Sequence, residues 1–220
     1  VERSRGLGDV YKRQEFGMGM KTAAGWLGNT WSVRTTALGE PVERFYEFDL
    51  QYVLDNDLKK LPFKESPCSS QDHYTIVTIS APTKNSPTNK SLDKIKTELA
   101  SIYRQSLRAN EMDLYVAGEP LSFEEYPILE APFARNPKGD IVRWKKEIDF
   151  KFGKYRAQGF IAILREINNT QNGLVLLRRG RVIVGAETDG RYFPKSLFGT
   201  QGNFRFKRLF GAVSYTHLTL

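Results

Sequence analysis

Two closely spaced glycines and a lysine near the start of the chain have the clearest potential for chemistry. The segment Gly17-Met18-Gly19-Met20-Lys21 precedes an apolar stretch with helical character. Glycines at a helix start let backbone N–H groups approach a phosphate closely, the helix N-terminus adds partial positive charge, and Lys21 adds a full charge. The pattern favours phosphate binding, with a tight turn that only caps a helix as the alternative.

Neither of the two commonest phosphate-binding glycine motifs fits this segment. A Walker loop has four residues between its first glycine and Gly-Lys-Ser/Thr, whereas Met20 separates Gly19 from Lys21. The dinucleotide fingerprint requires a glycine where Thr22 stands and a strand before the turn. A P-loop and a Rossmann site are therefore excluded.

The elements that must position these glycines are a short helix and several strands. The helix is expected to stop at Gly28-Asn29. Alternating residues predict strands over 31–36, 42–50 and 74–79, the first two forming a hairpin. The segment 59–72 is rich in proline and serine and predicts an exposed loop, and the breaker-rich run 82–89 predicts a domain boundary.

The second half of the chain predicts a helix against an antiparallel sheet. Apolar residues recur at three- and four-residue intervals over 92–106, with Ser91 as N-cap and Asn110 as a left-handed stop. Over 142–152 apolar side chains occupy one face of a strand, apart from Lys146, and charged side chains the other. Further strands are expected at 155–164, 174–177 and 181–184. The fold class is therefore α+β.

The run 16–40 resembles the second glycine box of the GHKL superfamily, the Bergerat-fold ATPases. This superfamily includes the DNA gyrase, mismatch-repair and microrchidia ATPases, sensor histidine kinases and the large heat-shock chaperone ATPase. In it the box closes the ATP lid and its amides cradle the phosphates. The resemblance implies that ATP, with Mg²⁺ in the intact protein, is bound through Gly17, Met18, Gly19, Met20 and Lys21.

Two further segments extend the resemblance. Tyr74-Thr75-Ile76 is similar to the family's Gly-Thr-x-Ile strand, which implies that Thr75 faces the adenine pocket, although Tyr74 stands where glycine is usual. Residues 88–212 resemble the transducer domain that follows the ATPase domain in the gyrase, mismatch-repair and microrchidia branches, most specifically at 173–185. The domains implied are the C-terminal portion of an ATPase domain over 15–87 and a transducer-like domain over 88–212.

Both ends of the chain resemble translated sequencing-adapter read-through of metagenomic open reading frames. Residues 1–14 and 213–220 are therefore expected to be non-native tails. The family's general-base glutamate, Mg²⁺-binding asparagine and adenine-binding aspartate lie upstream of the glycine box, and residues 1–14 do not supply them. The resemblance thus implies a fragment of an ATPase that is inactive alone, and we assign no catalytic or metal-binding residue.

Composition narrows the remaining function classes. The chain of 220 residues has one cysteine and two histidines, which excludes a disulfide framework and a Cys/His zinc site. It has no apolar stretch long enough for a membrane span and no signal peptide, so we expect a cytoplasmic protein without a membrane partner.

The formal charge of +8 belongs to the second half, because residues 88–212 hold 22 basic and 14 acidic side chains. Basic and aromatic residues alternate between 178 and 208. In related transducers one basic residue reaches the γ-phosphate when the domains close, and the closure is relayed to other domains or to a dimer partner. The alternative is a non-catalytic basic α+β module that binds nucleic acid along this segment, and a solvated basic surface is the simplest interpretation of all.

Overall fold

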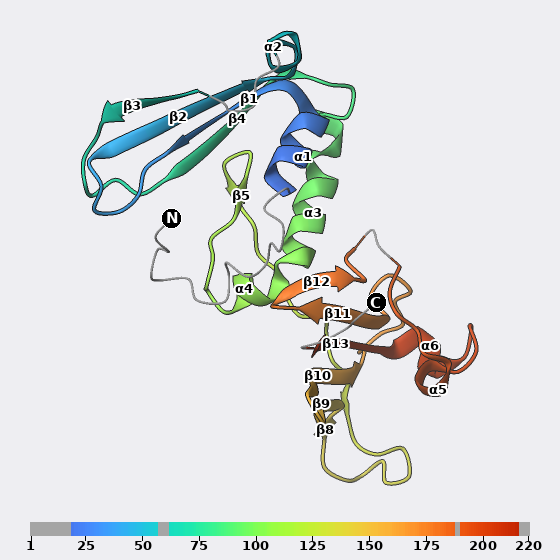
Figure 1. Cartoon of the computed structure of the whole chain (residues 1–220). Coiled ribbons are helices and arrows are strands. Elements are labelled where there is room, and N and C mark those ends of the chain that lie inside the picture. The colour runs from blue at the N-terminus through green and yellow to red at the C-terminus, as the bar shows by residue number, and fades with distance from the viewer. Residues whose placement is uncertain (1–18, 57–61, 188–189, 216–220) are drawn as a thin grey trace. The chain divides into compact units, whose positions relative to one another are not determined.

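The computed structural model describes residues 19–56, 62–187 and 190–215, and divides the chain into two compact units at Asn89/Lys90 (Figure 1). Gly17, Met18 and the expected tail at 1–14 lie outside the described residues. Both units combine helices with mainly antiparallel sheets, so the chain has the predicted α+β fold class.

The first unit is a four-stranded antiparallel sheet with two short helices against it. Its elements are α1 (Gly19–Leu27), β1 (Gly28–Thr35), β2 (Val42–Asp49), α2 (Leu50–Asp55), β3 (Phe63–Pro67) and β4 (Thr75–Pro82), with strand order β3-β2-β1-β4. The predicted helix end and the β1–β2 hairpin are confirmed.

The core of this unit lies between α1 and one face of the sheet. Ala24 of α1 packs with Trp31 and Val33 of β1, and Phe48 of β2 adds to the cluster because it is paired with Trp31. Alternation along the strands puts every second residue on this face. Burying these side chains fixes α1 on the sheet, and thereby the place of the residues at its start.

The breaker-rich run 82–89 has a structural role that its composition did not predict. The hydroxyl of Thr83 donates to the carbonyl of Trp26 at 2.7 Å, its N–H donates to the carbonyl of Leu27 at 2.9 Å, and the hydroxyl of Ser86 also donates to Leu27. The last carbonyls of a helix have no partner within the helix. This run therefore caps α1 as part of the first unit.

The second unit is a five-stranded sheet with helices against it. Its longer elements are α3 (Leu92–Ile102), α4 (Arg104–Arg108), β9 (Lys145–Phe152), β10 (Tyr155–Ile163), β11 (Gly173–Arg178), β12 (Arg181–Val184), α6 (Phe204–Arg208) and β13 (Leu209–Tyr215). Its shorter elements are a 3₁₀ turn (Asn89–Ser91), β5 (Tyr115–Val116), β6 (Glu119–Pro120), β7 (Glu130–Ala131), β8 (Val142–Arg143) and α5 (Lys195–Phe198).

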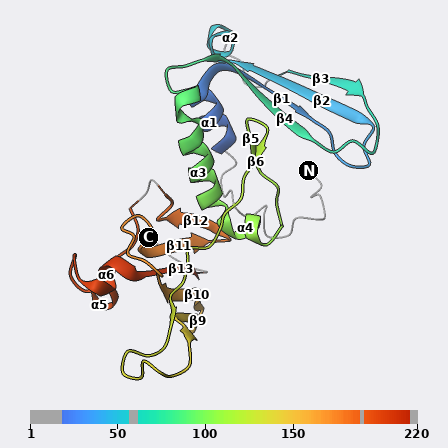
Figure 2. The same ribbon diagram turned by 180° about the vertical axis from the view of Figure 1, so that it is seen from behind.

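The strand order is β12-β11-β13-β10-β9, and only β11 and β13 run parallel among the pairs of this sheet that the structure describes. Val175, Leu177 and Val182 form a core with Ile102 of α3, so that α3 and α4 lie against β12 (Figure 2). A second core joins Ile128 and Leu164 to Phe210 of β13.

Four sequence predictions are corrected by the structure. The expected loop 59–72 contains β3, because Phe63 pairs with Tyr46 of β2 and stacks on its ring with centroids 5.4 Å apart. The expected strand 142–152 divides into β8, paired with β7, and β9, paired with β10. The expected tail at 213–220 begins inside β13, which pairs with β10 as far as Tyr215.

The fourth correction concerns the helix expected over 92–106, which is interrupted at Tyr103. Arg104 is buried, and its Nε donates to the carbonyl of Ser101 at 2.8 Å while its Nη2 donates to the Ser101 hydroxyl. The guanidinium thus occupies a carbonyl that would otherwise serve the helix ladder. Ser91 makes no side-chain cap, whereas Asn110 has the predicted left-handed backbone with φ 51°.

Candidate functional site

The described part of the glycine box forms the exposed start of α1. Gly19 and Met20 begin the helix, Lys21 follows them, and all three are exposed. The first turn contains no acidic residue. Its backbone N–H groups have no partner within the helix, and the helix dipole adds positive potential there. The start of α1 therefore combines N–H donors with one ammonium group, which suits a phosphate.

The box also contains a glycine whose role is purely steric. A Cβ on Gly28 would lie 2.5 Å from the carbonyl oxygen of Ser80 and 2.5 Å from Cγ2 of Ile79. Gly28 joins α1 directly to β1 and pairs with Pro82 at the end of β4. The close approach of β4 requires a residue without a side chain here.

Thr75 lies on the same sheet face as α1. It is exposed at the start of β4 and pairs with Thr35, and the two hydroxyl oxygens are 2.8 Å apart. Because Val33 pairs with Val77, Thr75 and Val77 share the face on which Val33 packs against α1. Along the strands, however, Thr75 is at the opposite end of β1 from Gly28, where α1 ends.

Tyr74, which replaces the usual glycine, ties β4 to β2. Its hydroxyl donates to the carboxylate of Glu43, which also lies 3.7 Å from Nε of Arg34. Its N–H donates to the hydroxyl of the buried Thr36 at 3.0 Å. The hydrogen bond to Glu43, followed by partial burial, raises the pKa of the Tyr74 phenol. The tyrosine therefore has a structural role that the family pattern did not indicate.

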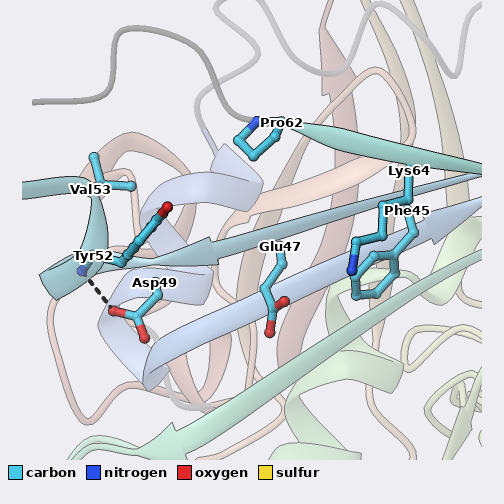
Figure 3. A pocket seen from close by; sticks show the side chains of 7 residues that line it. All are labelled: Phe45, Glu47, Asp49, Tyr52, Val53, Pro62 and Lys64. Atoms are coloured by element: carbon cyan, nitrogen blue, oxygen red, sulfur yellow. Dashed lines mark hydrogen bonds between the residues drawn. The ribbon is translucent and has the colours of Figure 1, made fainter. Parts of the chain in front are cut away.

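A cleft of about 340 Å³ opens on the other face of the same sheet (Figure 3). It is lined by Phe45, Glu47, Asp49, Tyr52, Val53, Pro62 and Lys64. Asp49 is already engaged, because it accepts a hydrogen bond from the N–H of Tyr52 at 3.0 Å and so caps α2. The cleft contains none of the residues that the sequence predicted as a site.

The structure separates the basic residues of the C-terminal segment into buried and exposed ones. Arg208 donates to the carbonyls of Leu164 and Arg165, in each case at 2.6 Å. The side chain of Arg191 is only 5% exposed. Both guanidiniums have structural partners, that of Arg191 buried and that of Arg208 half-buried, whereas Lys195 and Arg205 are exposed.

Arg191 belongs to a buried polar network. It donates to the hydroxyl of Tyr126 at 2.8 Å and to the carbonyl of Gln171 at 2.8 Å, and Tyr126 donates to Glu187 at 2.5 Å. Burial, followed by the bond to Glu187, raises the pKa of the Tyr126 phenol. Burial likewise lowers the pKa of the nearby Arg104, which lies 4.3 Å from the ring of Phe123. No signal in the local sequence links these distant residues.

Most of the aromatic residues between the basic ones are also structural. Phe193 stacks on Phe206 with centroids 4.5 Å apart and meets Phe198 edge-on at 5.2 Å. Phe198 is fully buried. Only Tyr192 and Phe204 of this alternating set are exposed. The expected groove of stacking platforms for nucleic acid is thus reduced to two rings.

Comparisons with known proteins give a structural likeness only. No protein-family model matches the sequence, and the search of curated proteins gives no match. The chain is similar to the ATPase domain of Thermus thermophilus gyrase B, with 10% identity and a TM-score of 0.42 over 92% of this chain and 58% of that one.

Two further solved structures are similar to the same degree. One is the ATPase domain of the mismatch-repair endonuclease MutL from Aquifex aeolicus, with 10% identity and a TM-score of 0.41 over 92% of this chain and 74% of that one. The other is the ATPase region of Saccharomyces cerevisiae topoisomerase II, with 10% identity and a TM-score of 0.44 over 92% of this chain and 51% of that one.

All three structures are ATPase domains or regions, and the likeness concerns the fold alone. The chain spans 58% of the gyrase B chain, so it corresponds in length to part of that domain. Within the described residues, no helix has the length and apolarity needed to cross a membrane.

Proposed function

We propose that this chain is a fragment of a GHKL-type ATPase, in which residues 15–87 contribute one side of an ATP site and residues 88–212 form the transducer. The observation that carries the proposal is the exposed start of α1, where Gly19, Met20 and Lys21 present N–H donors and one positive charge without an opposing acidic residue. Thr75, on the same sheet face, supports the assignment of the adenine side.

In this proposal the residues of the chain bind and orient the nucleotide. The N–H groups of Gly19 and Met20 hold phosphate oxygens, and Lys21 offsets their negative charge. Gly17 and Met18, the other residues of the predicted phosphate site, lie outside the described residues. Binding would close the lid over the nucleotide, and the transducer would relay the closure to other domains or to a dimer partner in a cytoplasmic protein.

The described residues at the start of α1 suit the phosphates of ATP, and none of them is assigned to its metal ion. Among all the described residues no group of three or more His, Cys, Asp or Glu side chains could hold a cation. We therefore assign none of the described residues to Mg²⁺. We expect the purified chain to bind nucleotide without turning it over, because no residue of the chain is assigned to the general-base glutamate, the Mg²⁺-binding asparagine or the adenine-binding aspartate that the resemblance implies. Saturable ATP hydrolysis by the chain would contradict this expectation.

The test is nucleotide affinity, measured by titration with ATP and ADP, in paired charge-reversal variants. Lys21→Glu replaces the phosphate-binding ammonium with a carboxylate, and we expect at least tenfold weaker binding. Lys64→Glu makes the same charge change at the cleft on the opposite face and should leave affinity unchanged. Equal affinities for the wild type and Lys21→Glu, or loss of binding in Lys64→Glu alone, would refute the assignment.

Protection from trypsin gives an independent test at the same position, because trypsin cleaves after lysine. ATP should slow cleavage after Lys21 and leave cleavage after the exposed Lys94 unaffected. An unchanged rate at Lys21 in saturating ATP would place the nucleotide elsewhere.

One observation favours a nucleic-acid-binding module as a second candidate. The exposed residues Lys195, Arg205 and Phe204 offer two positive charges and one ring near α5 and α6. Such a surface would bind single strands with an affinity that falls steeply as salt rises. Binding that is insensitive to ATP and abolished by Lys195→Glu with Arg205→Glu would favour this candidate, whereas no binding at low salt would remove it.

A further inference from the structure

The β9–β10 hairpin leaves an apolar face uncovered at the edge of the second sheet. Phe150 and Phe152 of β9 are 61% and 71% exposed, and Tyr155 of β10 is 43% exposed. They share one face because Phe152 pairs with Tyr155 and Phe150 with Ala157. The periodicity of the sequence put Phe150 and Phe152 on the inward, apolar face of a strand, but the described residues leave both rings exposed.

β9 is also the outermost strand of the described five-stranded sheet. Its eight residues pair with β10 on one side only. The backbone N–H and C=O groups on the outer side of an edge strand can accept another strand. An open edge next to exposed phenylalanines therefore offers both the hydrogen bonds and the apolar area of a strand-pairing interface.

The order of charges along β9 identifies which strand fits this edge. In an antiparallel pair, directly opposite residues lie on the same face. If a second β9 pairs antiparallel about Phe150, then Phe150 faces Phe150 of the second copy and Ile148 faces Phe152 of the second copy. On the other face, Asp149 then lies opposite Lys151 of the second copy, and symmetry makes this pair twice.

Neighbouring registers that keep the apolar faces together are less complementary. Pairing about Ile148 would place Glu147 opposite Asp149 and Lys145 opposite Lys151, which brings like charges together. Pairing about Asp149 would match Glu147 with Lys151, but it would also place Asp149 opposite itself and Lys146 opposite Phe152. In the register about Phe150, the like-charged pair is Lys146 opposite Lys154 of the second copy. It lies at each end of the paired segment, because Lys154 belongs to the turn after β9.

We propose that two copies of this chain associate through antiparallel pairing of β9 about Phe150, forming one continuous sheet. The chain holds the required charges in place before association. Arg156 of β10 contacts Asp149 through two hydrogen bonds, at 2.9 and 3.1 Å, and so keeps that carboxylate on the polar face of the strand. The interface lies wholly within the second unit and needs no nucleotide, so it is independent of the ATP site proposed above.

The test is the monomer–dimer equilibrium of the full chain without nucleotide, measured by sedimentation equilibrium. Lys151→Glu would place a second carboxylate opposite Asp149 of the second copy, twice in the symmetric pair, and we expect the dimer to dissociate at least tenfold more readily. Folding should not suffer, because residue 151 pairs with Arg156 within the chain. Lys154→Glu makes the same charge change three residues away and would face Lys146 of the second copy, so it should preserve or strengthen the dimer.

A cross-linking experiment fixes the register. In a Cys68→Ser background, Phe150→Cys should form a disulfide-linked dimer on mild oxidation, because paired residues of antiparallel strands lie within disulfide distance. Ile148→Cys, which would face residue 152 of the second copy, should cross-link much more slowly. A wild type that stays monomeric at high concentration, equal dimerisation of both charge variants, or faster cross-linking at 148 would overturn the proposal.

Discussion

Replacing Gly28 with alanine tests directly how the glycine box is built. The added Cβ would lie 2.5 Å from the Ser80 carbonyl oxygen and 2.5 Å from Ile79 Cγ2. The Ile79 side chain can rotate away, but the Ser80 carbonyl belongs to the backbone and cannot. Because a Cβ atom essentially never comes this close to a carbonyl oxygen, β1 and β4 must move apart to accommodate it. Overpacking of this kind costs about 1–3 kcal/mol.

Gly25 provides a control within the same box. It lies in α1, and a Cβ there would meet no atom within 4 Å. Alanine is favoured over glycine in a helix by about 0.5–1 kcal/mol, so Gly25→Ala should stabilise the unit. The two substitutions add the same methyl group three residues apart, and we expect effects of opposite sign.

Urea unfolding monitored by tryptophan fluorescence measures both changes. Trp31 is 6% exposed in the core of the first unit, which makes it a sensitive reporter, and Trp144→Phe removes the signal of the second unit. Gly28→Ala should lower the unfolding free energy of the first unit relative to the Trp144→Phe parent. A Gly28→Ala protein at least as stable as this parent would show that β4 does not approach Gly28 as closely as described, and would refute the reasoning.

The remaining predictions concern the second unit. Tyr126→Phe removes the hydroxyl that links Arg191 to Glu187 and should destabilise the unit by about 1–3 kcal/mol in thermal unfolding, because Arg191 loses a buried partner; an unchanged melting temperature would argue against the network. Because folding raises the Tyr126 pKa above its ordinary value of 10.0, the tyrosine's contribution is present below that value and is lost as pH rises through the folded pKa. Unfolding measured from about pH 8 to 12 should show this loss in the wild type and less of it in Tyr126→Phe. Phe198→Ala empties the fully buried position beside Phe193 and should cost about 3–5 kcal/mol, whereas a loss below about 1 kcal/mol would mean that the cluster collapses around the gap.

The local sequence pattern was sufficient to predict features that depend on a single helix, strand or turn. Alternation identified β1, β2 and β4, and Gly28 marked the end of α1, because side-chain direction and glycine's freedom are properties of the nearest residues. The same reasoning placed Gly19 at the start of a helix. It also gave the left-handed backbone at Asn110.

Tertiary contacts decided which strand faces and which basic side chains are buried, and the local sequence pattern could not predict this. The period-two pattern of β9 correctly gave two faces, but whether Phe150 is covered depends on how many strands and helices pack beside it, and the described sheet ends at β9. The basic residues near the C-terminus looked equivalent in sequence. Only the fold buries Arg191 against Tyr126, and leaves Lys195 in solvent, because burial of a charge depends on partners that are distant in the chain.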